Sequence, residues 1–233
     1  MYSIACLEGQ QSKTKRHHRV YPIEMEKSKG HNQSIRKMKA EDISQVSLIE
    51  SDAFPRLFPP TSFRRELQKK ISSILVAVSN SKMKKSEECP PYSKSTSSSL
   101  SYRSGNTGWK SGMDFLTGYI FLWDTTFEES HVMSIGTRRS HRRRGIGELL
   151  LHSALINLIE KGVRSLTLEV RVSNVPAISL YKKYRMTTQG LRKSYYIDNH
   201  EDAKIMTVDD IQSPDYRHLL NEKWKLLGHR LKN

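Results

Sequence analysis

The sequence predicts a mixed α/β domain, and two observations lead to that class. Short apolar runs rich in β-branched residues alternate with segments whose apolar residues recur at helical spacing. One of these runs passes through an arginine- and glycine-rich turn directly into a helix. The predicted order is strand, two helices, three strands, helix, strand, helix and two strands, before a C-terminal helix. At 233 residues the chain is long enough for one domain with a real core.

Two strands and two helices are predicted before a long polar segment. A strand is expected over Ser34–Met38, and the residues Ala40–Asp42 open a helix with an apolar stripe. Pro59–Ser62 starts a second helix that runs to about Lys70, because proline is tolerated in a first turn and Ser or Thr caps one. The β-branched run Ile74–Val78 predicts a buried strand.

The elements predicted after the polar segment follow closely on one another. They are strands over Tyr119–Trp123, Ser130–Thr137, Leu166–Val172, Thr187–Tyr196 and Ala203–Val208, and helices over about Gly147–Lys161, after Ser173-Asn174, and over Pro214–Leu231. The core face of the first of these helices is predicted to be Leu150, Leu151, Ala154, Leu155, Leu158 and Ile159. Gly162 suits the end of that helix, and Asn174 suits the start of the next.

Composition divides the chain into parts. Residues 1–33 are polar and aperiodic and predict a disordered basic arm, in which Met25 is an alternative start. Residues 34–211 hold the predicted domain, and residues 212–233 an amphipathic C-terminal helix. Residues 79–113 are dominated by Ser, Lys, Gly and Pro, so they cannot bury enough apolar surface to offset their ordering entropy. We expect them to form a flexible insertion in a hairpin that joins Val78 to Tyr119.

The charge of the chain limits its partners. A net charge of +15 attracts polyanions such as nucleic acid or phosphate-rich cofactors. No zinc-finger or basic-zipper spacing accompanies the charge, so specific nucleic-acid recognition is not expected. Cys6 and Cys89 make neither a disulfide framework nor a metal site, which fits a reducing cytoplasm. Neither a secretory signal nor a membrane span is expected, because no apolar stretch follows the basic run Lys13–Arg19 or is long enough to cross a bilayer.

The stretch Ile135–Leu151, IGTRRSHRRRGIGELLL, carries the clearest chemistry. A strand ends, arginines follow, and glycines lead into a helix whose first N–H groups have no partner. Those N–H groups, the helix dipole and the guanidiniums suit a phosphate or pyrophosphate, and we name Arg142–Glu148 the anion cradle. The alternative is a helix start with a cationic solvent face. The dinucleotide-binding pattern G-x-G-x-x-G and the P-loop pattern G-x-x-x-x-G-K-S/T are both absent.

On these residues the chain resembles the GNAT N-acetyltransferases, over Ser34 to about Ile211 apart from the insertion. Their signature Q/R-x-x-G-x-G/A is matched by Arg142–Gly147. The segments LTLEVRVSNVPAISLYKKY at Leu166–Tyr184 and YYIDNHEDAKIM at Tyr195–Met206 are most similar to the bacterial ribosomal-protein-alanine N-acetyltransferases of the RimI type. The resemblance implies the GNAT fold, a central mixed, mostly antiparallel twisted sheet flanked by helices, with acetyl-CoA in the cleft between the middle strands.

The resemblance also implies a donor site. The backbone at the end of the strand before the cradle would pair with the pantetheine arm, and the cradle would hold the pyrophosphate through N–H groups and arginine charge. An asparagine would bind near the pantetheine. The residues implied are Ile135, Gly136, Thr137, Arg142, Arg143, Arg144, Gly145, Ile146, Gly147, Glu148 and Asn174. No metal is implied.

Two catalytic roles follow from the same resemblance. Glu169 matches the general base, and its apolar neighbours predict a raised pKa that suits the task; an ordinary ion pair is the alternative. Tyr181 matches the general acid that protonates the departing CoA thiolate, with core packing as the alternative. Tyr195 and Tyr196 are candidates for the peptide groove or, alternatively, the core. His131 is interpreted as a structural histidine with a satisfied ring.

Two departures from the family pattern stand out. Arg185-Met186 replaces the Gly-Phe of the family's Tyr-x-x-x-Gly-Phe, so a residue with a Cβ must take a turn that favours glycine. The second is Arg56-Leu57-Phe58, where relatives often carry tryptophan near the substrate entrance. This second departure bears on acceptor preference.

The sequence therefore predicts an acyltransferase that moves the acetyl group of acetyl-CoA to the N-terminal α-amine of a protein, by direct attack in a ternary complex. By resemblance alone, the acceptor is a ribosomal protein. Two alternatives stay open. One is acetylation of other N-termini, lysines or small amines, and the other is a non-catalytic basic module that binds ribosome or nucleic acid on the same fold.

Overall fold

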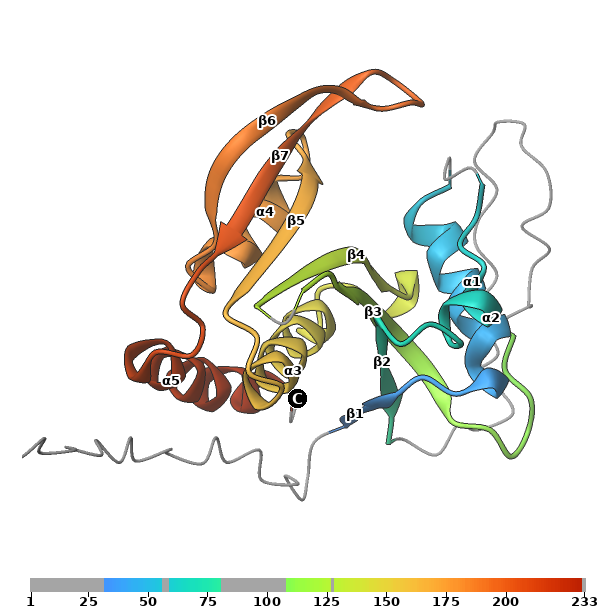
Figure 1. Ribbon diagram of the computed structural model, residues 1–233. Helices are drawn as coiled ribbons and strands as arrows, with labels where there is room; N and C mark the ends of the chain where they lie inside the picture. The colour runs from blue at the N-terminus through green and yellow to red at the C-terminus, as the bar shows by residue number, and fades with distance from the viewer. Residues whose placement is uncertain (1–31, 56–58, 81–107, 127, 232–233) are drawn as a thin grey trace, which may run out of the picture.

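A mixed β-sheet forms the centre of the molecule (Figure 1). The computed structural model describes residues 32–55, 59–80, 108–126 and 128–231. Within them the sheet has seven strands in the order β1-β2-β3-β4-β5-β7-β6. The strands are β1 Gln33–Lys37, β2 Ser72–Ser79, β3 Phe115–Asp124, β4 Glu129–Thr137, β5 Ser165–Arg171, β6 Thr187–Tyr196 and β7 Glu201–Val208. Of these neighbouring pairs only β4–β5 is parallel, so the predicted mixed, mostly antiparallel sheet is confirmed.

Some predictions fall outside the described residues. These are the N-terminal arm up to residue 31 with Met25, the departure at residues 56–58, and most of the insertion, residues 81–107. The strands on either side of the insertion, β2 and β3, are antiparallel neighbours. The predicted hairpin is therefore confirmed.

Helices cover both faces of the sheet (Figure 1). They are α1 Ile43–Ala53, α2 Phe63–Glu66, α3 Ile146–Glu160, α4 Val175–Lys183 and α5 Pro214–Leu231, with 3₁₀ helices η1 Ala40–Asp42 and η3 Arg139–His141. α1 and α2 share one apolar cluster with β2 and β3, while α3, α4 and α5 share another with the middle strands. None of the helices in the described ranges is long and apolar enough to cross a membrane.

The second predicted helix is shorter than expected. α2 ends at Glu66 instead of about Lys70. The N–H of Lys69 donates to the Glu66 carbonyl only three residues back, which tightens the chain. The Glu66 carboxylate also accepts hydrogen bonds from the Ser72 hydroxyl at 2.7 Å and the Trp123 indole at 3.0 Å. These contacts attach the end of α2 to β2 and β3, so the helix stops at Glu66. They are made with residues outside the helix, and a local sequence pattern therefore cannot predict them.

α3 fixes the position of the cradle because it is buried over most of its surface. All six residues predicted for its core face are at most 3 % exposed. Burying one such Leu or Ile side chain contributes roughly 1.5–3 kcal/mol. The helix ends as predicted, with Gly162 in the left-handed region at φ +82°. The N-terminus of α3 is therefore held rigidly at the end of β4.

The ladder between β4 and β5 ends early. It joins Glu129–Val132 to Ser165–Leu168, and in the described sheet β4 then continues to Thr137 with no partner in β5. Met133 is an extra residue on β4 relative to β3, and such a bulge bends a strand. Figure 1 shows β5, β6 and β7 leaning away from β4. The backbone edge at the end of β4 is thus left open toward β5.

The end of α4 takes the turn that the sequence predicts for a glycine. Arg185 lies in the left-handed region at φ +58°. Its N–H donates to the Lys182 carbonyl, and the Met186 N–H donates to the Tyr181 carbonyl at 3.1 Å, which is the Schellman arrangement. Met186 is buried and its side chain fills the apolar space beneath the turn. The turn is kept, and Arg185 bears its backbone strain.

His152 joins α3 to α5. Its ring is 1 % exposed and stacks on Trp224 of α5, with centroids 5.4 Å apart and planes 21° apart. Its Nδ1 lies 3.5 Å from the Tyr184 hydroxyl. Burial lowers the pKa of His152 to about 4, with a smaller opposing effect from Glu148. The ring is therefore neutral at pH 7 and acts as an aromatic contact between the helices.

Replacing Arg185 measures the strain at the end of α4. Both Arg185→Gly and Arg185→Ala lose the ion pair with Asp215, but only glycine accepts the left-handed turn freely. We expect the glycine variant to be more stable than the alanine variant by about 1–2 kcal/mol. Urea unfolding of the two proteins gives this difference. Equal stability would show that the turn is unstrained.

The burial of His152 makes stability depend on pH. Between about pH 6.5 and pH 4 the unfolded chain binds a proton at this histidine and the folded chain does not. The free energy of unfolding should therefore fall with decreasing pH, by up to about 1.4 kcal/mol per pH unit from this group. His152→Phe keeps a ring against Trp224 and should have a shallower slope in urea unfolding at pH 7, 6 and 5.

The matched control is His229→Phe on the exposed side of α5. Its slope should equal that of the wild type. An unchanged slope in His152→Phe would mean that protonation of His152 does not oppose folding.

Candidate active site

The cradle turns through two left-handed residues. Arg143 lies at φ +65° and Gly145 at φ +81°, on either side of Arg144. The first bond of α3 runs from the Leu149 N–H to the Gly145 carbonyl at 2.9 Å. The helical N–H groups before it have no acceptor inside the helix, and they belong to Ile146, Gly147 and Glu148. A ring of backbone donors therefore stands at the positive end of the helix dipole.

The three cradle arginines divide into two kinds. The Arg142 guanidinium donates to the Asp52 carboxylate on α1 at 3.3 Å and to the Thr137 carbonyl at 3.3 Å. Arg142 therefore ties the cradle to α1, and its predicted contact with a phosphate stays a prediction. Arg143 and Arg144 are exposed and form no ion pair or hydrogen bond with another residue in the described part of the chain. They are the cations left for an anion.

The positive charges around the cradle also affect a neighbouring histidine, His141. His141 lies just before the cradle, in η3, and its ring packs at 5.6 Å from the ring of Phe115. Burial, and then the charges of Arg144 and Arg138, lower the pKa of His141 to about 4. The imidazole is neutral at pH 7, and the same field favours a bound anion.

Glycines at this site serve different purposes. A Cβ on Gly136 would stand 2.7 Å from the Tyr119 ring, so this glycine is required by packing beneath β4. A Cβ on Gly147 would meet nothing closer than Thr137 Oγ1 at 3.7 Å. Packing does not demand glycine there, and its absence of a side chain keeps the first turn of α3 bare for a ligand.

The open edge of β4 adjoins the cradle. Ile135, Gly136 and Thr137 pair with β3 on one side and face the opening toward β5 on the other. Their outward backbone groups are suited to hydrogen bonding with an extended amide chain, as in an added strand. The predicted pantetheine segment thus lies where the edge of β4 has no strand partner in β5.

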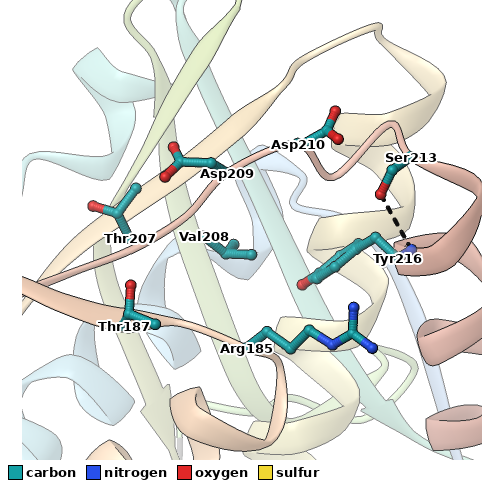
Figure 2. Close-up of a pocket in the computed structure, with 8 residues that line it drawn as sticks. All are labelled: Arg185, Thr187, Thr207, Val208, Asp209, Asp210, Ser213 and Tyr216. Atoms are coloured by element: carbon teal, nitrogen blue, oxygen red, sulfur yellow. Dashed lines mark hydrogen bonds between the residues drawn. The ribbon is translucent and has the colours of Figure 1, made fainter.

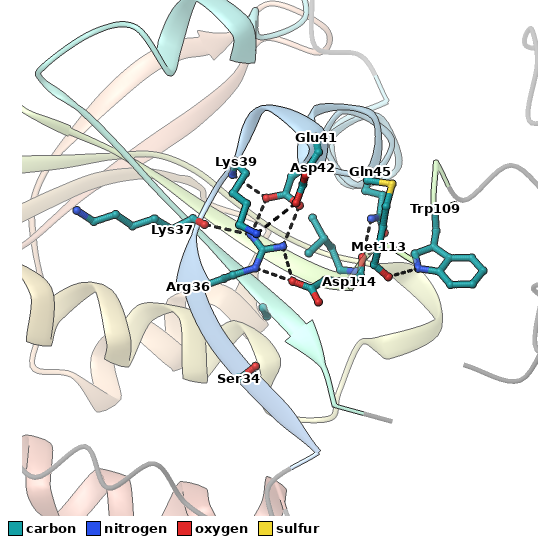
Figure 3. A network of polar contacts seen from close by, with 12 residues as sticks. Ser34, Arg36, Lys37, Lys39, Glu41, Asp42, Gln45, Trp109, Met113 and Asp114 are labelled. Atoms are coloured by element: carbon teal, nitrogen blue, oxygen red, sulfur yellow. Dashed lines mark hydrogen bonds and ion pairs between the residues drawn. The ribbon is translucent and has the colours of Figure 1, made fainter. Parts of the chain in front are cut away.

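A polar network fixes α1 beside this end of the sheet (Figure 3). Arg36 on β1 makes a bidentate pair with Asp42 at 2.7 and 3.0 Å and also bonds Asp114 at 2.8 Å. Gln45 on α1 donates to the Asp114 carbonyl and accepts from the Leu116 N–H at 3.0 Å. α1 is therefore tied to β1 and β3 independently of its contact with the cradle.

Glu169 lies at the vertex of the opening. It follows Leu168, the last β5 residue paired with β4, and the alternation of β5 places it on the face opposite α3. Its side chain is 8 % exposed and bonds His131 Nε2 at 2.6 Å and Arg192 at 3.2 Å. The predicted raised pKa is wrong. The hydrogen bond from His131 lowers the pKa of Glu169 against the opposing effect of burial, with further lowering by the charges of His131 and Arg192.

Tyr181 and Asn174 come from α4. Tyr181 is 5 % exposed, and burial followed by the influence of Tyr196 raises the pKa of its phenol. The hydroxyl therefore keeps its proton at pH 7. The Asn174 side chain accepts a hydrogen bond from the Ala177 N–H at 3.3 Å, so the predicted helix cap is confirmed. Both side chains are held by the same short helix on the α3 side of the sheet.

The two tyrosines of β6 gather near Glu169. Tyr195 and Tyr196 form an edge-to-face pair with centroids 5.3 Å apart. Arg171 stacks on Tyr196 at 3.7 Å from its centroid. Burial raises the pKa of Tyr196 to about 12, and Glu169 adds a smaller upward effect on both tyrosines. Tyr196 also contributes to the raised pKa of Tyr181, after burial.

Sequence reasoning missed two partners of Glu169. His131 was expected to be a satisfied structural histidine, and its ring does have a partner, but that partner is Glu169. The sequence predicts no role for Arg192, the second partner of Glu169. The parallel register joins His131 to Thr167, two residues before Glu169 on the same face of β5. Both the parallel direction and the register of β4 and β5 are needed to place His131 beside Glu169, and neither can be read from the local sequence pattern.

A cavity beside β7 and the start of α5 lies away from the predicted site residues (Figure 2). It measures about 350 Å³ and is lined by Arg185, Thr187, Thr207, Val208, Asp209, Asp210, Ser213 and Tyr216. None of the predicted site residues lines it. Within the described ranges, no group of three or more His, Cys, Asp and Glu side chains could hold a metal ion.

The chain resembles known acetyltransferases. It matches the model of the Acetyltransferase (GNAT) family over residues 84–185. It is 33 % identical over 175 residues to a Bacillus subtilis (strain 168) protein provisionally described as a ribosomal protein bS18-alanine N-acetyltransferase, covering 75 % of this chain and 94 % of that protein. An N-alpha-acetyltransferase of Saccharolobus solfataricus is 28 % identical over 183 residues, covering 78 % of this chain and 95 % of that protein.

The fold agrees with this similarity. The crystal structure of the ribosomal-protein-S18-alanine N-acetyltransferase from Escherichia coli matches with a TM-score of 0.55 at 22 % identity, covering 76 % of this chain and 94 % of that one. The predicted GNAT fold is confirmed. The chain belongs to the GNAT family of acetyltransferases.

Proposed function

We propose that this protein transfers the acetyl group of acetyl-CoA to the N-terminal α-amine of a protein, and that the acceptor is a ribosomal protein. GNAT acetyltransferases use acetyl-CoA, and the two relatives described above are named as a ribosomal-protein-alanine N-acetyltransferase and an N-alpha-acetyltransferase. One observation carries the proposal. Glu169 stands at the vertex of an opening whose other wall, the free edge of β4, leads directly to the cradle.

The donor is held along β4. The N–H groups of Ile146, Gly147 and Glu148, with the charges of Arg143 and Arg144, bind the pyrophosphate. The open edge at Ile135–Thr137 pairs with the amides of the pantetheine arm. Asn174 lies at the start of α4 and lines the same path. This arrangement brings the thioester toward the vertex.

Proton transfer is assigned to Glu169 with His131. An α-ammonium group has a pKa of about 7.7–8.0 and must lose a proton before its nitrogen attacks. A carboxylate with a lowered pKa is a weak base by itself, but its bond to His131 makes a pair in which the carboxylate orients the ring and stabilises the imidazolium. The side chain of His131 is 24 % exposed and that of Glu169 only 8 %, so the ring is the more accessible member.

The remaining chemistry balances without a metal. The neutral amine attacks the thioester carbonyl and forms a tetrahedral intermediate whose nitrogen carries one extra proton. That proton passes to solvent through the Glu169–His131 pair, and the carbon–sulfur bond breaks to give an amide and a thiolate. Tyr181, whose pKa is raised, donates its phenolic proton to the thiolate. Tyr195 and Tyr196, with Arg171 stacked on the latter, line the approach of the acceptor.

The catalytic assignment is tested by acetyl transfer from labelled acetyl-CoA to a panel of N-terminal peptides. Glu169→Gln and His131→Gln should each lower kcat by about 10²-fold or more, since both remove the proton-accepting pair. Tyr181→Phe should lower kcat by at least about tenfold, because the leaving thiolate loses its proton donor. Glu160→Gln, at the exposed end of α3, is the matched control and should leave kcat unchanged.

Three results would contradict parts of this assignment. Donor binding without transfer to any peptide would favour a non-catalytic basic module. Transfer to lysine or small amines in preference to N-terminal peptides would contradict the proposal that the acceptor is a protein N-terminus. Equal rates in wild type and all three catalytic variants would leave the activity standing and remove the residue roles.

The donor assignment is tested by binding of CoA at two salt concentrations. Arg143→Gln and Arg144→Gln should each raise the Kd about tenfold, since each removes a charge-assisted bond to phosphate. Both should also weaken the dependence of the Kd on salt. Arg64→Gln, on the exposed side of α2, removes the same charge from the other face of the sheet. A loss of affinity as large in Arg64→Gln would place the effect in overall charge and not in the cradle.

A further inference from the structure

The last turn of α5 lies directly behind the cradle. Leu227 and Leu231 are 0 % and 3 % exposed, and they form one apolar cluster with Leu149 on α3. A Cβ placed on Gly145 would stand 3.3 Å from Leu227 Cδ1 and 3.5 Å from Leu231 Cδ2. The left-handed turn at Gly145 therefore rests on these two leucines. Figure 1 shows the end of α5 beside α3.

The same turn of α5 supplies a charge to the first turn of α3. The side chain of Glu148 is 8 % exposed, and its Oε2 lies 2.7 Å from the Arg230 guanidinium. Lys183 on α4 lies 3.4 Å from the same oxygen. Glu148 is the one acidic residue in the first turn of α3. Its charge suits the helix dipole but repels an anion bound at the same N–H groups, so its neutralisation matters when phosphate is present.

α5 is docked by contacts that do not involve its last turn. The Tyr216 hydroxyl donates to the Tyr184 carbonyl at 3.0 Å, and Leu220 is 0 % exposed in the main core. Trp224 stacks on His152. These three residues hold the first half and the middle of the helix against α3 and α4. Changes in the last turn can therefore be made while α5 stays in place.

We propose that the last turn of α5 is a positioning element of the donor site. Leu227 and Leu231 hold Gly145 in the conformation that aims the cradle N–H groups at the pyrophosphate. Arg230, together with Lys183, neutralises Glu148 so that its carboxylate does not oppose the bound phosphates. The inference rests on the proposed function of the cradle as the acetyl-CoA pyrophosphate site. Donor affinity then depends on a helix that lies beyond the predicted 34–211 domain.

The charge part of the proposal is tested by the donor Kd of the full chain. Arg230→Gln should raise the Kd for CoA about tenfold while kcat at saturating acetyl-CoA stays within about twofold, since Arg230 pairs with Glu148 in the cradle and not with a proposed catalytic residue. Arg230→Lys keeps the charge and should recover most of the affinity. The double variant Arg230→Gln with Glu148→Gln should also bind more tightly than Arg230→Gln. Lys225→Gln removes an exposed charge from the same helix and should not alter the Kd.

The packing part of the proposal is tested with Leu227→Ala, and the neighbouring Leu226→Ala is its control. Leu227→Ala removes the buried side chain behind Gly145, and Leu226→Ala removes an exposed leucine that is 62 % accessible on the same helix. Leu227→Ala should raise the Kd for CoA about tenfold at a temperature where both variants are folded by circular dichroism, and Leu226→Ala should not. If Leu227→Ala fails to fold, the Kd values of Arg230→Gln and Arg230→Lys still test the proposal.

The outcomes separate this inference from the proposed function. Wild-type protein that binds no CoA would overturn both. Wild-type protein that binds CoA, with the same Kd in Arg230→Gln and Lys225→Gln, would overturn the inference alone. A purely structural role for the last turn predicts lower thermal stability with unchanged Kd and KM, and that result would also overturn it.

Discussion

The early end of the β4–β5 ladder is the constraint on which the site depends. Two parallel strands that pair over only four residues must diverge, and the bulge at Met133 bends β4 as they do. The divergence leaves one strand edge unpaired inside a sheet, which is costly unless something else satisfies it. In the proposed function an extended amide chain satisfies it, and the cradle at the far end selects a chain that carries phosphate. On that proposal, fold and donor recognition have one structural origin.

The environment of Glu169 shows why the pKa of a glutamate on a strand cannot be judged from its sequence neighbours. Leu168 and Val170 are apolar, but they point to the α3 face, away from the glutamate. The groups that touch the carboxylate come from β4 and β6, and they lower its pKa. Successive residues of a strand point to opposite faces of the sheet, so their side chains have different surroundings. In the proposed mechanism, proton transfer is therefore a property of the Glu169–His131 pair, which the sheet register assembles.

Most of the fold could be predicted from local patterns, and the exceptions share a cause. The bounds of α5 and β6, the core face of α3 and the left-handed turn at Arg185 follow from periodicity and turn chemistry along the chain. The length of α2 and the partner of His131 depend instead on contacts with distant strands. The position of α5 behind Gly145 is of the same kind. The cradle was predictable because its donors are backbone groups in one continuous segment.

The number of arginines in the cradle does not by itself give the number of phosphate contacts. Three consecutive arginines suggest three phosphate contacts, yet Arg142 is committed to Asp52 on α1. Conversely, Arg230 lies far along the chain and belongs to the charge balance of the same turn through Glu148. Ion pairs from α1, α4 and α5 thus converge on seven consecutive residues. A turn with two left-handed residues needs such support, because exposed backbone in that conformation has several alternatives of similar energy. In the proposed donor site, the cations that hold the cradle and the cations that bind the phosphates are therefore different residues, and only the phosphate-binding ones should make binding sensitive to salt.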